Sequence, residues 1–571
     1  MLTTFTAPAF AGTWYIEDGD ITISAGESGN NVTQNENTTK NDTDTIITNR
    51  EEGASSHTVT IDAKDKDDKV EVTLKDVNID ASRGSEAAVS VTGKGDTTIE
   101  LDGDNELQGG DKHAGLEHNQ TVDSEGNVTS GKLTIQDDND NAGSLTATGG
   151  YFGAGIGGGS AKAGQVTITG GTITAISGDG AGIGGGQGNM GSNAGNADIE
   201  ISGGTIEATG GYTSAGIGGG YYGDATIKIT GDAVIKNAAG GFFGAGIGGG
   251  GGGNGDITIS GNAKIENAQG GYAGSGIGGG YGASGTVAIK DDSTVTATGG
   301  EVGAGIGGGV GGLADITIEG NATVNATGGV GSAGIGGGYD AEDDDDGTGN
   351  KITIKSNESG APTVNATGGE SSIDKKTGEK IPGGAGIGSG VGDAKANITL
   401  EGKVTIVAKA GESNAAIGDM NGEQVFTGLD GSITRYNSEG NDTTLPTDPG
   451  YPVPADTSSS GGSSADASVQ ESVFPGLIVT DKDGQRISYT SIRGNNVLSL
   501  RVGRFTASLH ASLSTLRQLR AEGIDTITFQ TILCSTTLSV DELLAMGGED
   551  TEVVLTHHIR SSMLTVGGKA V

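Results

Sequence analysis

The glycine-rich string at residues 153–159 contains a spacing that is associated with nucleotide binding. Gly153, Gly155 and Gly158 stand as G-x-G-x-x-G. In a dinucleotide-binding unit such a loop follows a strand and opens a helix, so that its backbone amides cradle phosphate. Here close variants of the string recur along the chain, and no helical periodicity follows any copy. The repetition therefore indicates a structural role and argues against a nucleotide site.

The charged residues do not form a recognisable catalytic set. A lyase that acts on uronic acids needs cations to neutralise the carboxylate and a base to remove the adjacent proton. Basic residues in the coils from Tyr151 to Tyr339 are scattered and include no arginine: Lys162, Lys228, Lys236, Lys264 and Lys290. Acidic residues are too numerous for a hydrolytic carboxylate pair to be identified. We expect no enzymatic activity and retain a lyase-like enzyme as an alternative.

Two acidic loops are weak candidates for calcium binding, since Ca²⁺ prefers oxygen ligands. One loop holds Asp343 and Asp345, and the other holds Asp137 and Asp140. The alternative interpretation is that both loops are simply solvated. No other cofactor is indicated, because the single cysteine, Cys534, excludes metal sites built on paired cysteines.

The histidines near the C-terminus are predicted to be ordinary surface residues rather than ligands. His557 and His558 are adjacent, and neighbours on a strand point to opposite faces. His510 and Cys534 are expected to be polar surface residues as well.

Aromatic residues form only 4% of the chain, and many of them flank the glycine strings. Those that precede a string are Tyr151, Phe152, Tyr212, Phe242, Phe243 and Tyr272, and those that follow one are Tyr221, Tyr222, Tyr281 and Tyr339. In stacked repeats they would form columns along one edge. Such columns offer either stacking faces for sugar rings or purely structural ring stacking over the glycine corners. These residues are the candidate carbohydrate-binding site.

The elements that must position these rings are set by an internal repeat. The isoleucine of the glycine string recurs at 156, 183, 217, 247, 277, 306, 335, 387 and 417, mostly at intervals of 29 or 30 residues. The longest interval, 52 residues, contains the acidic insert Glu342–Asp346 and a polar stretch. Between the strings, apolar and polar residues alternate, as Ile199 and Ile201 do with Asp198 and Glu200. This period of two indicates short strands.

One such unit cannot bury its own apolar face, so stacking of successive units is required. The pattern predicts an all-β fold: a parallel β-helix with coils of about 29–30 residues. We place it at residues 12–440, with irregular coils over 12–150 and glycine-rich regular coils over 151–440. Asn237 and Asn267 align with alanines of other coils, such as Ala208, and are predicted to form an inward asparagine stack.

The remaining segments are of other kinds. Residues 1–11 end in Ala9-Phe10-Ala11 and resemble the remnant of a signal peptide. Residues 441–470 are rich in proline and serine and are predicted to be an extended linker. Residues 471–571 have the pattern of a small α+β domain of unknown role, with helices at Ser512–Glu522 and Ser539–Met546.

The charge composition of the chain restricts the classes of molecule that it can bind. The formal net charge is −40, and residues from Glu471 onward hold 10 acidic and 9 basic side chains, which leaves about −39 for the preceding 470 residues. Such a surface repels phosphate backbones, so nucleic acid is not expected as a partner. No apolar run is long enough to insert into a membrane.

The segments Thr13–Ile23, Thr97–Leu107 and Gly131–Gly159 resemble a family of secreted carbohydrate-binding β-helix proteins from Gram-positive and gut bacteria, related to polysaccharide lyases. The resemblance covers roughly residues 13–430. It implies a right-handed β-helix, a cell-surface polysaccharide as partner, and bound calcium as an additional ligand. Together with the scattered lysines, it leads us to expect a secreted or cell-surface glycan-binding protein without catalysis. We expect this protein to be monomeric. A structural adhesin or stalk that displays the C-terminal domain is the alternative.

Overall fold

The computed structural model describes residues 10–451, apart from 140, 189–194, 344–346 and 374–377. It also describes residues 477–570, apart from 483, 488, 495, 503, 505, 532–533, 549–550 and 559–560. The chain divides into two compact units, Met1–Pro452 and Val453–Val571. Residues 1–9 of the predicted signal remnant and residues 452–470 of the predicted linker lie outside the described residues. No helix within the described ranges is long and apolar enough to cross a membrane.

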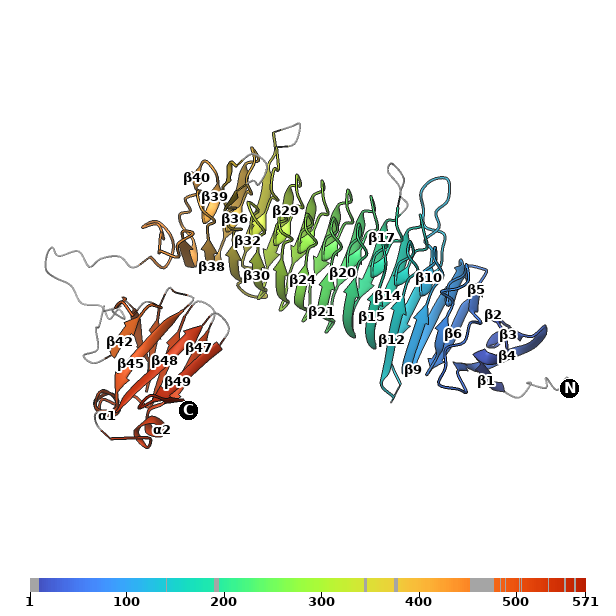
Figure 1. Ribbon diagram of the computed structural model, residues 1–571, viewed down its shortest axis with the longest axis horizontal. Coiled ribbons are helices and arrows are strands. Elements are labelled where there is room, and N and C mark those ends of the chain that lie inside the picture. Colours follow the sequence, from blue (N-terminus) through green and yellow to red (C-terminus); the bar gives the residue numbers. More distant parts are fainter. Residues whose placement is uncertain are drawn as a thin grey trace. The chain divides into compact units, whose positions relative to one another are not determined.

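The first unit is a parallel β-helix, which confirms the predicted fold class. Its coils stack one on the next in chain order (Figure 1), and hydrogen bonding joins them into one 39-stranded sheet. Each regular coil contributes a strand of two or three residues at the glycine string, and the other strands of these coils are five to seven residues long. The first coils are less regular, and their strands are β1 (Phe10–Tyr15), β2 (Ile21–Ala25), β3 (Asn30–Gln34), β4 (Asn37–Thr48), β5 (Val59–Ala63), β6 (Lys69–Lys75), β7 (Asn78–Asp80), β8 (Val89–Gly93), β9 (Asp96–Gln108), β10 (Leu116–His118), β11 (Leu133–Gln136) and β12 (Gly143–Thr148).

The regular coils form three columns of parallel strands. The glycine-string column contains β13 (Ile156–Gly157), β16 (Ile183–Gly184), β19 (Ile217–Gly218), β22 (Ile247–Gly248), β25 (Ile277–Gly278), β28 (Ile306–Gly307), β31 (Ile335–Gly336), β36 (Ile387–Gly388) and β39 (Ile417–Asp419). The second column contains β14 (Gly164–Ile168), β17 (Ala197–Ile201), β20 (Ala225–Ile229), β23 (Gly255–Ile259), β26 (Gly285–Ile289), β29 (Ala314–Glu319), β32 (Asn350–Lys355) and β37 (Ala396–Glu401). The third column contains β15 (Thr172–Ile176), β18 (Thr205–Thr209), β21 (Val234–Ala239), β24 (Lys264–Gln269), β27 (Thr294–Thr298), β30 (Thr323–Thr327), β33 (Thr363–Thr367), β38 (Lys403–Lys409) and β41 (Asp430–Tyr436).

The core is a narrow column in which the isoleucine side chains of successive coils lie directly above one another. Ile217 pairs with Ile247, and Ile247 pairs with Ile277, and all three are fully buried. The 52-residue interval does not break this register, because Ile335 still pairs with Ile387. Part of the intervening insert forms a small hairpin, β34 (Ser372–Ile373) with β35 (Lys380–Ile381). A short strand, β40 (Gly422–Glu423), folds back on β39.

The glycine after each string isoleucine has a backbone conformation that L side chains avoid. Gly248 has φ of +137°, and a Cβ atom there would lie 1.9 Å from the carbonyl oxygen of Gly278 in the next coil. Adjacent coils therefore approach closely only because this position carries no side chain.

The asparagine stack was predicted to face inward, and this prediction is wrong. Asn237 pairs with Glu207, an outward position, and the buried residue of that strand is Ala238. An extra residue in β21 and β24 shifts the register, as a β-bulge does. The two asparagines still join neighbouring coils, because Asn267 Nδ2 donates a 2.7 Å hydrogen bond to Asn237 Oδ1 on the outer, half-buried face.

The predicted linker begins too early, because residues before 452 pack on the last coil. Arg435 is fully buried, and its guanidinium donates to the carboxylate of Asp448. The backbone amide of Ile433 also donates to the carbonyl of Pro449. This contact closes the C-terminal end of the β-helix core.

The second unit contains one antiparallel sheet, one mixed sheet and two short helices (Figure 1). One sheet holds β42 (Leu477–Thr480), β45 (Ala507–Ser512), β48 (Glu552–His558), β49 (Ser561–Val566) and β50 (Lys569–Ala570), and the other holds β43 (Thr490–Gly494), β44 (Val497–Arg501), β46 (Thr526–Gln530) and β47 (Ser535–Ser539). In the second sheet, β44 and β46 run parallel. The helices are α1 (Leu513–Ala521) and α2 (Val540–Leu544), and each is capped by a serine, Ser512 or Ser539, that accepts a backbone hydrogen bond three residues on.

Candidate functional site

Three of the predicted rings form a stacked ladder along the coil axis. Tyr212 and Phe242 are 5.3 Å apart between ring centroids, with planes inclined by 17°. Phe242 and Tyr272 are 4.7 Å apart and nearly parallel, at 4°. The rings lie in successive coils just after the third strand column. Phe242 is therefore stacked between its two neighbours, Tyr212 and Tyr272.

A second group of rings continues the ladder toward the glycine strings. Phe243 lies edge-on to Tyr212 and 5.3 Å from Tyr281. Tyr221 and Tyr222 lie 4.2 Å apart, and the Tyr221 hydroxyl donates a 3.3 Å hydrogen bond to that of Tyr222. This hydrogen bond is the main reason that the pKa of Tyr221 is raised above the usual value for tyrosine.

The structure does not bring all ten predicted residues together. Tyr151 and Phe152 form a separate edge-on pair at 4.7 Å. Tyr339 lies further along the β-helix, beside Gly331.

Among the described residues, the aromatic side chains that are most exposed to solvent all belong to the predicted set. The exposed ones are Tyr151, Tyr212, Phe242, Tyr272 and Tyr281, at 58%, 57%, 39%, 42% and 49%, and all five belong to the predicted set. Apolar rings normally bury much of their surface, and an exposed group of them marks a contact surface.

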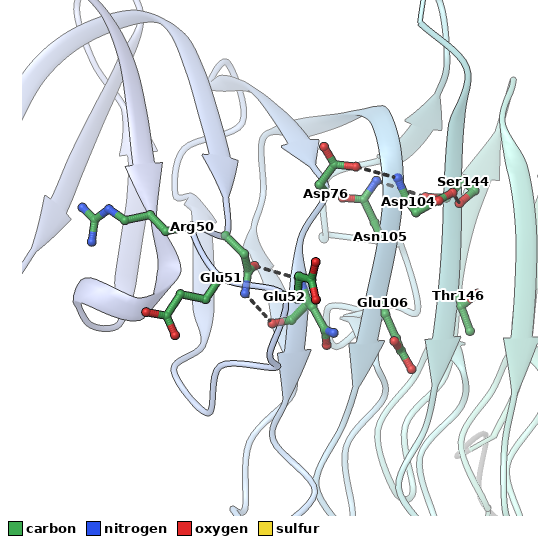
Figure 2. A pocket seen from close by; sticks show the side chains of 11 residues that line it. Arg50, Glu51, Glu52, Asp76, Asp104, Asn105, Glu106, Ser144 and Thr146 are labelled. Atoms are coloured by element: carbon green, nitrogen blue, oxygen red, sulfur yellow. Dashed lines mark hydrogen bonds between the residues drawn. The ribbon is translucent and has the colours of Figure 1, made fainter.

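A polar groove of about 660 Å³ lies on the outer face of the N-terminal coils (Figure 2). Its walls are Asn49, Arg50, Glu51, Glu52, Asp76, Asn78, Asp104, Asn105, Glu106, Ser144 and Thr146. These come from the segment after β4, from the turn between β6 and β7, and from β7, β9 and β12. Sequence reasoning missed this groove, because carboxylates and amides scattered over residues 49–146 carry no motif.

The groove is acidic despite the presence of one arginine. Arg50 is held in an ion pair with Asp18, with Nη1–Oδ1 and Nη2–Oδ2 distances of 2.5 and 2.6 Å, and its guanidinium lies over the ring of Tyr15. The pair with Arg50 holds the pKa of Asp18 below its usual range. Figure 2 shows the Arg50 side chain pointing away from Asp76 and Asp104. The groove therefore presents hydrogen-bond acceptors with little positive charge.

Several groove residues are fixed by hydrogen bonds to the backbone. Asp76 Oδ1 accepts from the amide of Asp104 at 3.1 Å, and Asn49 Oδ1 accepts from the amide of Asn78 at 2.8 Å. Asn105 is buried and accepts from the amide of Val77. These bonds pre-order the groove without a ligand.

The calcium candidates are not assembled into a metal site in the part of the chain that the structure describes. No group of three or more acidic, histidine or cysteine side chains there has the arrangement that a metal ion needs. Asp343 instead forms an ion pair with Lys395, Oδ2 to Nζ 2.8 Å, which lowers the pKa of Asp343. Asp137 Oδ2 accepts from the amide of Gly143, while Asp140 and Asp345 lie outside the described residues.

The prediction that His557 is a surface residue is wrong. His557 is fully buried, since it shares the inner face of β48 with Val553 and Leu555. Its ring nitrogens lie 3.1 Å from Thr531 Oγ1 and 2.9 Å from Thr536 Oγ1. Burial lowers the pKa of His557. His558, on the opposite face, is exposed.

The coil register and the outward rings define a parallel β-helix protein with a candidate binding surface on its exterior. Five segments match the family model described as Beta helix repeat, at residues 141–160, 166–187, 199–221, 287–310 and 316–339. No curated protein matches the chain significantly, and no solved structure does. The match supports the repeat fold and carries no activity or ligand with it.

Proposed function

We propose that this protein is an extracellular or cell-surface carbohydrate-binding β-helix that acts without catalysis. The observation that carries the proposal is the ladder of three exposed aromatic rings, Tyr212, Phe242 and Tyr272, at one corner of consecutive coils. Tyrosine combines an apolar ring face with a hydroxyl, a combination suited to sugar rings, which carry both C–H faces and hydroxyl groups.

The polar groove supports the same function by a different chemistry. Carboxylates, amides and hydroxyls line it, and all of these accept or donate hydrogen bonds to sugar hydroxyls. Ser144 and Thr146 lie on β12, and the same stretch of chain reaches Tyr151 five residues after Thr146. A long glycan therefore has polar and aromatic contacts available along one face.

A binding role fits the charge distribution better than a lyase role. The elimination reaction of a lyase needs a cluster of cationic side chains. Two of the five lysines between Tyr151 and Tyr339 are engaged by glutamates, Lys264 with Glu266 and Lys290 with Glu319. The alternative role, a stalk that displays the C-terminal domain, is favoured by the division of the chain into two compact units.

A glycan array probed with the full-length protein, with and without calcium, tests the proposal. Binding to one class of glycan, lost in a Tyr212→Ala/Tyr272→Ala variant that still folds, as shown by an unchanged circular dichroism spectrum, is the expected result. A folded protein that binds no glycan would favour the stalk. Release of unsaturated oligosaccharides from any polysaccharide would instead make the protein an enzyme.

A further inference from the structure

The polar groove of the N-terminal coils is lined by negative charge that its own residues do not balance. Five of the residues that line it are acidic: Glu51, Glu52, Asp76, Asp104 and Glu106. Arg50 is the one basic residue among the described residues that line the groove, and its guanidinium is bound to Asp18, which is not part of the groove. Lys75, which precedes Asp76 in the chain, is likewise bound to Asp102 at 2.8 Å.

Three of these carboxylates have no partner in the part of the chain that the structure describes. The side chains of Glu51, Glu52 and Glu106 are exposed and form no hydrogen bond or ion pair with another described residue. By contrast, Asp104 Oδ1 accepts a 2.8 Å hydrogen bond from the hydroxyl of Ser144. Three negative charges in one groove are therefore available to a cationic ligand, since charge complementarity favours such a ligand over a neutral or anionic one.

A single metal ion does not fit this distribution of charge. Within the described ranges, no three acidic, histidine or cysteine side chains are arranged so that they could hold a metal ion. The carboxylates instead line a groove of about 660 Å³. Sites for organic ligands occupy about 300–1,000 Å³. The matching cation is therefore an extended organic molecule with more than one charge, separated by neutral atoms.

The floor of the groove supplies hydrogen-bonding groups for those neutral atoms. Asn78 on β7 pairs with Glu106 on β9, and Glu106 pairs with Thr146 on β12, so that an amide, a carboxylate and a hydroxyl lie side by side (Figure 2). Adjacent strands are about 4.8 Å apart. Amides and hydroxyls bond to sugar hydroxyls, and carboxylates form the stronger, charge-assisted bonds to ammonium groups. This combination suits a sugar that carries both hydroxyl and amino groups.

We infer that the polar groove binds a glycan whose sugars carry protonated amino groups, with Glu51, Glu52 and Glu106 receiving those groups. This inference rests on the proposed carbohydrate-binding function and names a ligand class for one part of the binding surface. The aromatic ladder remains the part that contacts the apolar faces of sugar rings.

The test is isothermal titration calorimetry of the full-length protein with two hexasaccharides that share one backbone. The glucosamine hexamer is cationic, and chitohexaose carries an uncharged N-acetyl group in place of each amine. A buffer at about pH 6 keeps the carboxylates ionised, because their usual pKa values are about 4, and physiological salt screens distant charges. The glucosamine hexamer should bind at least about tenfold more tightly than chitohexaose.

Neutralising the three unpartnered carboxylates should remove this preference. The Glu51→Gln/Glu52→Gln/Glu106→Gln variant keeps the size of each side chain and should bind the glucosamine hexamer about tenfold more weakly.

The matched control removes three exposed charges from coils outside the groove, in an Asp198→Asn/Glu207→Gln/Asp256→Asn variant. Its affinity should stay within about twofold of the wild type. Equal losses in the two variants would assign binding to the overall net charge of −40 and overturn the site.

Two further probes distinguish other cations. Spermine shares the amine chemistry without the sugar, and spermine binding as tight as that of the glucosamine hexamer would overturn the assignment to a glycan. Calcium chloride binding that is lost in the groove variant would show a metal site and also overturn the inference. If chitohexaose or another glycan binds and the glucosamine hexamer does not, the carbohydrate-binding function stands and this ligand class is wrong. If no glycan binds, both fall.

Discussion

Arg435 and Asp448 form a fully buried ion pair at the C-terminal end of the β-helix, with Nε–Oδ2 and Nη2–Oδ1 distances of 2.7 and 2.9 Å. Arg435 also donates to Glu423 and to the carbonyl of Gln424. The guanidinium therefore closes the last coil by satisfying several acceptors at once.

Removing one member of this pair should destabilise the β-helix strongly. Arg435→Met leaves the Asp448 carboxylate buried without its partner, which costs about 3–5 kcal/mol. Urea unfolding monitored by circular dichroism measures the loss. Lys264→Ala, which breaks an exposed pair with Glu266, serves as the control and should change stability by less than about 1 kcal/mol. Similar losses in both variants would contradict the structural role of the buried pair.

Because the coils stack closely, we expect the glycine positions to differ in how well they tolerate substitution by alanine. Gly248→Ala places a methyl group against the Gly278 carbonyl in an unfavourable backbone conformation and should cost about 2–5 kcal/mol. Gly282 also has a positive φ, +71°, but its surroundings are open, so Gly282→Ala should cost only about 1–2 kcal/mol. Thermal unfolding of the two variants side by side checks the difference, and equal melting temperatures would argue against close coil contact at Gly248.

Phe242 should contribute more to stability than its exposure suggests. Phe242→Ala removes two stacked contacts, with Tyr212 and Tyr272, each of about 0.5–1.5 kcal/mol, for a total of about 1–3 kcal/mol. Tyr151→Ala removes one ring contact, the edge-on contact with Phe152, and should cost about 1 kcal/mol or less. Chemical denaturation of both variants distinguishes them, and a larger loss for Tyr151→Ala would show that the ladder is not a structural unit.

Stability of the C-terminal unit should fall in mild acid. The pKa of His557 is lowered in the folded state, so below about pH 6.5 the unfolded chain takes up a proton that the folded chain resists. The contribution of the neutral ring is present above that pH and is lost as the pH falls toward the folded-state pKa. Urea unfolding at pH 8.0 and 5.5, read from peptides 477–570 by limited proteolysis and mass spectrometry, measures the effect.

His557→Gln provides the control for this pH effect, because the amide does not titrate in that range. In that variant the difference between the two pH values should shrink. An unchanged difference would assign the acid sensitivity to other groups.

The amino-acid sequence by itself determined the β-helix. The alternation of Ile199 and Ile201 with acidic residues and the regular return of the string isoleucine leave stacking as the way to bury them, so register follows from local pattern. Only the tertiary structure decided the direction of Asn237, the burial of His557 and the pairing of Arg435 with Asp448. Three factors set these features: a single extra residue in a strand, the choice of inner face in the C-terminal sheet, and contacts between distant segments. None of these factors leaves a signal in the local sequence.

The candidate site was likewise predicted in part from the sequence and decided in part by the tertiary structure. Residue types and spacing predicted that aromatic residues flank the glycine strings in successive coils, because every coil of nearly constant length returns to the same point. The orientation of each ring and the polar groove at Asp76 and Asp104 depend on which side chains face each other across coils. Those contacts arise from packing in three dimensions, and the linear sequence contains no record of them.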